Sequence, residues 1–265
     1  MPALVLLHGY AGRPEGWRAV QERLPPGRVV VAAPLPGHDP LAPLPQAGLR
    51  SSYEAALAAY AETLESLAGV GLHLAGYSLG ARIALGLLAR YPGRYAGATL
   101  IGVNPGLRSE AARLERARSD AAWAQRLRSG GIDRFVAAWE AQPIFATQAA
   151  LPEALRAAQR ALRRSHDPSS LAACLERLGL AATPSLWPAL PAITAPIHLI
   201  AGAEDPAYAA IAEEMLTLLP DARLTLVPGA GHNPVLEAPQ QIAALLTDPD
   251  RKPKARSEPK ANVGP

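Results

Sequence analysis

The sequence predicts an α/β fold in which a mostly parallel, doubly wound sheet carries one inserted helical segment. Three observations support this prediction: short continuous apolar runs, helical patterns between them, and one long stretch that interrupts the alternation. Continuous apolar runs are typical of strands buried on both faces, and strand–helix alternation is typical of a parallel sheet. With 265 residues, of which 49% are hydrophobic, the chain is long enough for one such domain with its insertion.

The predicted strands are rich in Val, Ile, Leu and Ala, and each ends at glycine, proline or a polar residue. They cover residues 3–9, 28–34, 72–76, 98–104, 197–202 and 223–229. Helices are predicted between them over residues 52–68, 79–91 and 207–219. The last two helices stop at Pro92 and Pro220, because proline cannot continue a helix.

The stretch over 107–190 is helical in pattern and has no strand-like run. We predict that it forms a cap inserted into a core made of 1–106 and 191–248. Eleven arginines but only six acidic residues lie between Arg108 and Arg164. This excess fits either a solvated face with salt bridges or a cap that faces an anionic substrate.

The net charge of +3 comes from the C-terminal end of the chain. Five of the 26 Lys and Arg and two of the 23 Asp and Glu follow Pro249, which leaves 21 of each sign in 1–249. A neutral body argues against a nucleic-acid partner. The segment 249–265 is rich in Pro, Lys and Ser, and we predict a disordered basic tail.

The single cysteine, Cys174, cannot form an internal disulfide, which favours a reducing cytoplasm. No apolar run reaches the roughly 18 residues of a membrane-spanning helix, so no membrane partner is predicted.

A five-residue motif, Gly76-Tyr77-Ser78-Leu79-Gly80, joins the third predicted strand to the next helix. Gly-x-Ser-x-Gly in a strand-to-helix turn is typical of a nucleophile elbow. The glycines permit a tight turn that lifts the Ser78 hydroxyl above the sheet. The Leu79 amide then lies at a helix N-terminus, which favours negative charge. The motif predicts Ser78 as a catalytic serine.

A serine hydroxyl needs a base, and His232 is the histidine that follows the last predicted strand, in Gly-Ala-Gly-His-Asn. The base in turn needs an acid that fixes its tautomer. Glu204 and Asp205 both follow the 197–202 strand. We predict Asp205, with Glu204 as the alternative, so that the triad has the order serine, aspartate, histidine.

Two backbone amides are needed to stabilise a developing oxyanion. Leu79 supplies one, and Tyr10 in the loop after the first strand, His8-Gly9-Tyr10, is predicted to supply the other. The sequence has no metal-ligand spacing, phosphate-binding glycine loop or dinucleotide fingerprint, so neither a metal nor a cofactor is predicted.

Several segments extend these motifs through most of the chain. They are LLHGY (6–10), PLPGHD (34–39), GYSLGAR (76–82), NPGLRSEAARLERARSD (104–120), AAWEAQPIFAT (137–147) and GAGHN (229–233). The chain resembles the α/β-hydrolase superfamily. It is more specifically similar to the MenH group of menaquinone biosynthesis, the 2-succinyl-6-hydroxy-2,4-cyclohexadiene-1-carboxylate synthases. Relatives carry an extra N-terminal segment, so the resemblance implies a sheet trimmed at that edge.

The resemblance implies a carbon–oxygen lyase that eliminates pyruvate from an enolpyruvyl-cyclohexene tricarboxylate, with the triad serine as the base. Three substrate carboxylates need cationic partners, and the resemblance assigns them to Arg82, Arg116 and Arg164. The register leaves Arg118 as an alternative to Arg116, and Arg163 as an alternative to Arg164.

Tyr77 and Trp139 match aromatic pocket residues of the same group, and an anionic small molecule is the implied partner. The alternative function is a carboxylester or thioester hydrolase with Ser78 as covalent nucleophile. A third hypothesis, a catalytically inactive domain that binds a ligand, is disfavoured by the complete triad. The sequence does not indicate an oligomeric state, and a monomer is compatible with it.

Overall fold

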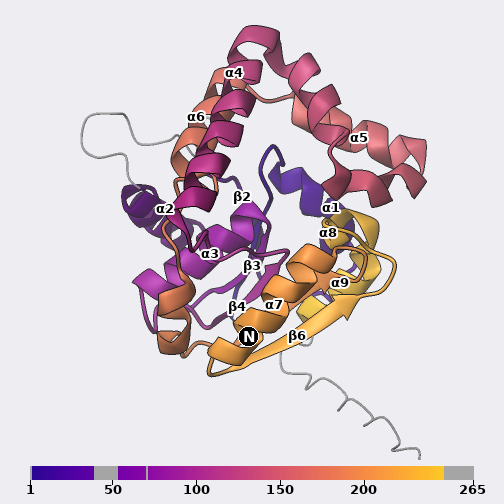
Figure 1. Ribbon diagram of the computed structural model, residues 1–265. Coiled ribbons are helices and arrows are strands. Elements are labelled where there is room, and N and C mark those ends of the chain that lie inside the picture. Colours follow the sequence, from indigo (N-terminus) through magenta and orange to yellow (C-terminus); the bar gives the residue numbers. More distant parts are fainter. Residues whose placement is uncertain (1, 39–52, 70, 248–265) are drawn as a thin grey trace, which may run out of the picture.

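The computed structural model describes residues 2–38, 53–69 and 71–247, so the predicted tail at 249–265 lies outside the described residues. Six strands form one sheet in the order β2-β1-β3-β4-β5-β6, and all five neighbouring pairs are parallel (Figure 1). The strands are β1 (Leu4–Leu7), β2 (Val30–Ala33), β3 (His73–Tyr77), β4 (Gly97–Ile101), β5 (Ile197–Gly202) and β6 (Ala222–Val227). The predicted parallel α/β sheet is confirmed, and each strand overlaps its predicted run.

Helices connect the strands, as parallel pairing requires. Those of the core are η1 (Pro14–Trp17), α1 (Arg18–Gln21), α2 (Tyr53–Ala68), α3 (Leu79–Arg90), η3 (Trp187–Ala192), α7 (Pro206–Leu218), α8 (Pro234–Glu237) and α9 (Pro239–Thr247). Among the described residues, none of the helices has the length and apolar character needed to cross a membrane.

The sheet is buried on both faces because successive side chains of a strand point to opposite sides. Val5 and Leu7 pack with α2, α3 and α7 in one hydrophobic cluster. Leu4 and Leu6 pack in a second cluster, with Trp17 of η1 among its buried residues. This two-sided burial explains why the strand sequences are continuously apolar.

The stretch predicted as a helical insertion (107–190) follows β4, and its last residues lie in η3, before β5. It contains α4 (Glu110–Glu140), η2 (Pro143–Ala150), α5 (Glu153–Arg164) and α6 (Pro168–Leu178). Ser109 caps α4 by accepting a hydrogen bond from the Ala112 amide at 3.1 Å. Figure 1 shows α4, α5 and α6 together beyond one end of the sheet.

The parallel register brings the functional loops together. Leu7 pairs with Gly76, so the loop after β1 leaves the sheet beside Ser78. Gly202 pairs with Val227, so the loops after β5 and β6 also leave side by side. Ligand sites of open α/β sheets lie at these carboxyl ends of the strands.

Candidate active site

Ser78 lies in a tight turn between β3 and α3. Its φ of 52° is a conformation that residues other than glycine rarely adopt. The turn is held by hydrogen bonds from the Ser78 amide to the Ile101 carbonyl at 2.8 Å and from the Gly80 amide to the His8 carbonyl at 3.1 Å. A Cβ on Gly76 would approach the Ala81 nitrogen to 2.5 Å, so this position requires glycine.

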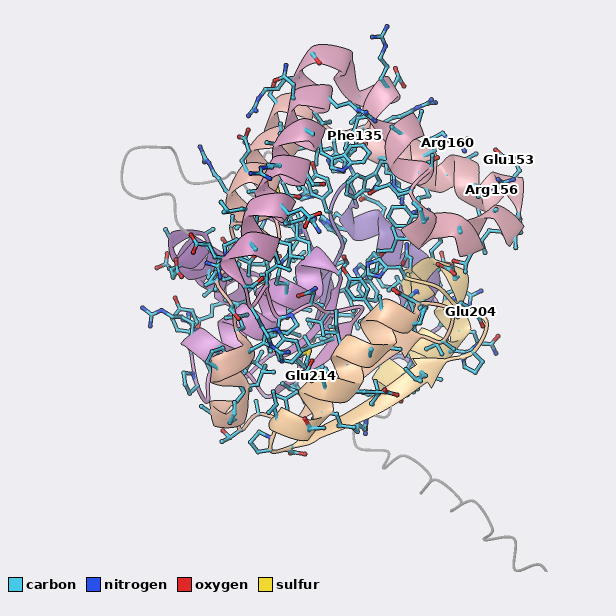
Figure 2. The ribbon with its side chains drawn as sticks, in the orientation of Figure 1. Phe135, Glu153, Arg156, Arg160, Glu204 and Glu214 are labelled. Carbon is cyan, nitrogen blue, oxygen red and sulfur yellow. The ribbon has the colours of Figure 1, made fainter. Side chains whose placement is uncertain are left out.

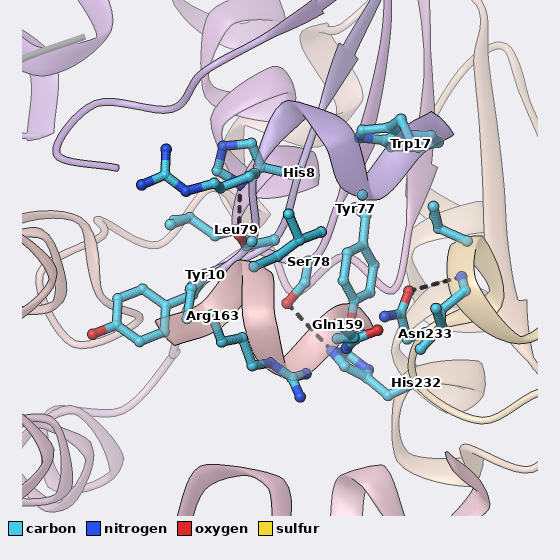
Figure 3. A pocket seen from close by; sticks show the side chains of 18 of the residues that line it. His8, Tyr10, Trp17, Tyr77, Ser78, Leu79, Gln159, Arg163, His232 and Asn233 are labelled. Carbon is cyan, nitrogen blue, oxygen red and sulfur yellow. Dashed lines mark hydrogen bonds between the residues drawn. The ribbon is translucent and has the colours of Figure 1, made fainter. Parts of the chain in front are cut away.

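The three residues predicted as a triad are brought together from three separate loops. His232 Nε2 lies 3.2 Å from Ser78 Oγ (Figure 3), and His232 Nδ1 lies 2.8 Å from Asp205 Oδ2. His232 and Asp205 are both buried. Glu204 is exposed, and its amide bonds to the Ala230 carbonyl, so the structure favours Asp205 over Glu204 as the partner of the histidine (Figure 2).

Glu237 of α8 holds the loop that carries His232. Its carboxylate accepts hydrogen bonds from the Gly231 amide at 2.7 Å and from the Asn233 amide at 3.1 Å. The two amides flank His232, so Glu237 fixes the backbone on both sides of the base. Glu237 was not predicted from the sequence, where its only signal is a carboxylate five residues after His232.

The two predicted oxyanion-hole amides belong to Tyr10 and Leu79. Neither amide donates to a protein acceptor within the described residues. The loop that carries Tyr10 is closed by a bond from the Gly12 amide to the Gly9 carbonyl at 3.0 Å, and Ala11 adopts a φ of 55°. The Tyr10 hydroxyl donates to the Leu171 carbonyl of α6 at 3.0 Å, which joins this loop to the helical insertion.

A cavity of about 570 Å³ opens at Ser78 and His232 and includes Arg82 and Arg116 in its lining. Arg82 of α3 donates to the Leu178 carbonyl at 3.0 Å, and its buried Nε has no protein partner among the described residues. Burial lowers the pKa of the Arg82 guanidinium from its ordinary value. Arg116 of α4 pairs with the buried Asp120 at 2.7 Å.

The structure corrects the predicted third arginine. Arg164 does not line the cavity; it is exposed and pairs with Asp133 at 2.9 Å. Arg163 lines the cavity instead, is 6% exposed and pairs with Glu140 at 2.8 Å (Figure 3). Adjacent residues of an α-helix point about 100° apart, so only one of the two faces inward.

On α4, the structure places Arg116, and not the alternative Arg118, at the cavity. Arg118 is exposed and lies outside the lining, whereas Arg116 belongs to it. Several other arginines of the insertion form ion pairs with acidic neighbours. On α5, Arg156 and Arg160 both approach Glu153 (Figure 2). Some arginines of this stretch therefore form surface ion pairs, and others face the cavity.

Aromatic rings surround the histidine. The ring centroid of the predicted Tyr77 lies 5.6 Å from that of His232, and the ring centroid of Tyr208, which was not predicted, lies 4.3 Å from it. Burial raises the pKa of both phenols, which keeps them neutral. The predicted Trp139 also lines the cavity and stacks on Phe135 at 5.3 Å. The signal for Tyr208 was its place three residues after Asp205, in the first turn of α7.

Part of the cavity wall is apolar. Leu155, Ala158 and Leu162 come from one stripe of α5, with the three- and four-residue spacing of a helix face. Trp17 of η1 and Val235 of α8 line the same cavity. The cavity thus combines a cationic part with an apolar wall.

Comparison with known proteins agrees with this geometry. A family model described as "Alpha/beta hydrolase family" matches residues 4–245. The chain is 37% identical to a 2-succinyl-6-hydroxy-2,4-cyclohexadiene-1-carboxylate synthase of Enterobacter sp. (strain 638), over 92% of this chain and 90% of that protein. It is 33% identical to a putative synthase of the same name from Bacillus subtilis (strain 168), over 93% and 89%.

Two solved structures extend the comparison. MenH from S. aureus matches with a TM-score of 0.85 and 28% identity, covering 92% of this chain and 91% of that one. A thermophilic esterase from Thermogutta terrifontis matches with a TM-score of 0.78 and 23% identity, covering 94% and 89%. The esterase shares the fold.

Proposed function

The chain belongs to the alpha/beta hydrolase family and, within it, to the group of 2-succinyl-6-hydroxy-2,4-cyclohexadiene-1-carboxylate synthases, and from this premise we propose that it is a carbon–oxygen lyase of menaquinone biosynthesis. Its reaction eliminates pyruvate from an enolpyruvyl-cyclohexene tricarboxylate. The substrate is thus an anionic small molecule. The single cysteine of the chain supports a cytoplasmic setting.

The triad supplies the base in this proposal. His232 Nε2 accepts the Ser78 proton, and Asp205 stabilises the imidazolium that forms. The Ser78 oxygen removes a proton from the substrate ring. The electron pair released breaks the bond between the ring carbon and the enolpyruvyl oxygen, and the enolate that leaves takes up a proton at its methylene carbon to become pyruvate. Negative charge that develops on a substrate oxygen is stabilised by the Tyr10 and Leu79 amides.

The observation that carries the proposal is the set of arginines in the cavity. Arg82, Arg116 and Arg163 come from three different helices and line the cavity that contains Ser78. A tricarboxylate offers three anionic groups, and charge-assisted hydrogen bonds from guanidinium groups suit carboxylates well.

Pyruvate release tests the proposal. Purified protein receives the enolpyruvyl-bearing precursor, with Ser78→Ala as the control and a nitrophenyl ester assayed in parallel. We expect serine-dependent pyruvate release far above ester turnover. Ester cleavage without pyruvate would contradict the lyase function.

One observation favours a second activity, the cleavage of carboxylic esters or thioesters with Ser78 as nucleophile. The apolar wall formed by Leu155, Ala158 and Leu162 suits an acyl chain better than a carboxylate. If an acyl chain binds there, kcat/KM for nitrophenyl esters rises about fourfold per added methylene, from about 0.8 kcal/mol of burial each. A flat dependence on chain length would exclude this activity.

A further inference from the structure

Three buried histidines lie next to the loop that carries Tyr10, and none of them belongs to the triad. The ring of His38 lies 5.0 Å from that of His8 and 5.4 Å from that of His166. All three side chains are buried. His38 comes from the turn after β2, and the proposed reaction leaves it without a role.

His38 contacts the loop directly. Its Nε2 accepts a hydrogen bond from the Ala11 amide at 3.0 Å, and its Nδ1 lies 3.3 Å from the Pro36 carbonyl, to which it donates. This pair of contacts requires the tautomer with the proton on Nδ1. Burial, with His8 and His166 as cationic neighbours when protonated, lowers the pKa of His38 well below its ordinary value. The ring therefore stays neutral and keeps its acceptor.

Ala11 is the part of the loop that most needs this support. It is fully buried and adopts a φ of 55°, in the left-handed region that alanine disfavours. Without His38 Nε2, its amide would be a buried donor without an acceptor, and the loop would relax to satisfy it. Tyr10 directly precedes Ala11, so such a relaxation would turn the Tyr10 amide away from Ser78.

We propose that His38 is a positioning residue for the oxyanion hole: by accepting the Ala11 amide, it holds the strained turn that directs the Tyr10 amide toward the reacting oxygen. The inference rests on the proposed roles of Ser78, Tyr10 and Leu79. The turn of His38 is itself tied to the helical insertion, because His166 Nδ1 lies 3.2 Å from the His38 carbonyl.

Two substitutions separate this role from general packing. In His38→Gln, the amide oxygen is as many bonds from Cα as Nε2 is, so it can accept the Ala11 amide. In His38→Asn, the polar atoms reach only as far as Nδ1, so the contact with Pro36 is possible and the one with Ala11 is lost. His73→Asn is the matched control, because it removes another buried histidine from the far end of the sheet.

We expect His38→Asn to lower kcat for pyruvate release at least tenfold, with KM within twofold, because arginines elsewhere bind the substrate. Loss of one oxyanion-hole donor typically lowers kcat about 100- to 1000-fold. A donor that is displaced rather than removed should lower kcat by less than this. His38→Gln should stay within threefold of the wild-type kcat. His73→Asn should lower the melting temperature without this loss of kcat.

Phenylboronic acid provides a readout that does not depend on the lyase reaction. Ser78 Oγ bonds to boron, the serine proton passes to His232, and a boron hydroxyl occupies the oxyanion hole. The inhibition constant, measured with nitrophenyl acetate, should rise for His38→Asn in proportion to the fall in kcat and return with His38→Gln. If the wild type binds the boronate but releases no pyruvate, the lyase function fails while the role of His38 is still decided.

Nitrogen-15 NMR of the wild-type protein tests the tautomer without any substitution. We expect His38 at pH 7 to carry its proton on Nδ1, with Nε2 unprotonated. A proton on Nε2 would overturn the proposal. The proposal would also be overturned if His38→Asn kept wild-type kinetics and boronate affinity, or if His38→Asn and His38→Gln lost equal amounts of kcat. If His38→Asn does not fold, the NMR spectrum and the kcat of His38→Gln decide.

Discussion

Arg163 and Arg164 are neighbours in the sequence but face different surroundings. Arg163 is buried in the cavity lining, and Arg164 makes an exposed ion pair with Asp133. We expect Arg163→Ala to lower kcat/KM for the tricarboxylate about 10- to 150-fold, from the roughly 1.5–3 kcal/mol of a charge-assisted hydrogen bond. Arg164→Ala is the matched control and should stay within twofold, because exposed ion pairs contribute little. Steady-state kinetics of both variants measures this, and equal losses would refute the assignment.

The same pair shows what the sequence can predict at the scale of a residue. Ser78, Asp205 and His232 were predictable because each follows a strand, and parallel strands deliver their loops to one edge of the sheet. Arg163 was left as an alternative because no sequence pattern states which side of α5 faces inward. Its orientation depends on packing between α5 and the loop after β1, where Arg13 donates to Ser165 at 2.6 Å.

At the scale of an element, the elbow between β3 and α3 sets a strict limit on side-chain size. A Cβ on Gly80 would approach the His8 carbonyl oxygen to 2.6 Å and would also contact the Leu7 carbonyl. Both atoms are backbone and cannot move away cheaply. We expect Gly80→Ala to lower the free energy of unfolding by about 2 kcal/mol or more, in the upper part of the range for overpacking.

Gly130→Ala is the matched control for this prediction. Its added Cβ would lie 3.4 Å from the flexible Arg134 side chain, and alanine favours helix over glycine by about 0.5–1 kcal/mol. We expect a neutral to slightly stabilising effect in urea unfolding. A loss in Gly130→Ala as large as that in Gly80→Ala would argue against the steric explanation.

The elements themselves were predictable to different degrees. The strands and the helices α2, α3 and α7 follow from continuous apolar runs and their glycine or proline ends. Inside the insertion, the sequence indicated helical structure but not where one helix ends and the next begins. The long α4 changes direction at Gly131, where φ is 71°, and α5 turns most of its apolar stripe to a cavity rather than to a core. Such arrangements depend on tertiary packing, which local periodicity does not encode.

At the scale of the whole molecule, acid should destabilise the fold through histidines far from the cavity. His73 bonds to Thr99 at 3.0 Å, and His198 bonds to Thr225 at 2.8 Å, across neighbouring strands. Burial, and secondarily nearby arginines, lowers the pKa of His73 to about 4 and that of His198 to about 3. Both therefore stay neutral in the folded protein at pH values where the unfolded chain, with a pKa of about 6.5, is already protonated.

The sign of the effect follows from proton uptake. Well above pH 6.5, neither the folded nor the unfolded state binds a proton at these histidines, so they do not reduce the free energy of unfolding. As pH falls toward 4, the unfolded state binds protons that the folded state excludes, so stability decreases. At pH 5 the difference is about 2 kcal/mol per histidine, from 1.36 kcal/mol per pH unit. Urea unfolding at pH 7.5, 6.5, 5.8 and 5.0 measures this loss before most carboxylates titrate.

His73→Gln identifies the source of this pH dependence. Glutamine keeps polar atoms near Thr99 but does not titrate, so the variant should be less stable at pH 7.5 and lose about 2 kcal/mol less than the wild type on going to pH 5.0. The triad is distant from these histidines, so activity at pH 7.5 should persist while the protein is folded. An unchanged slope in His73→Gln would show that other groups, and not this buried histidine, make the fold sensitive to acid.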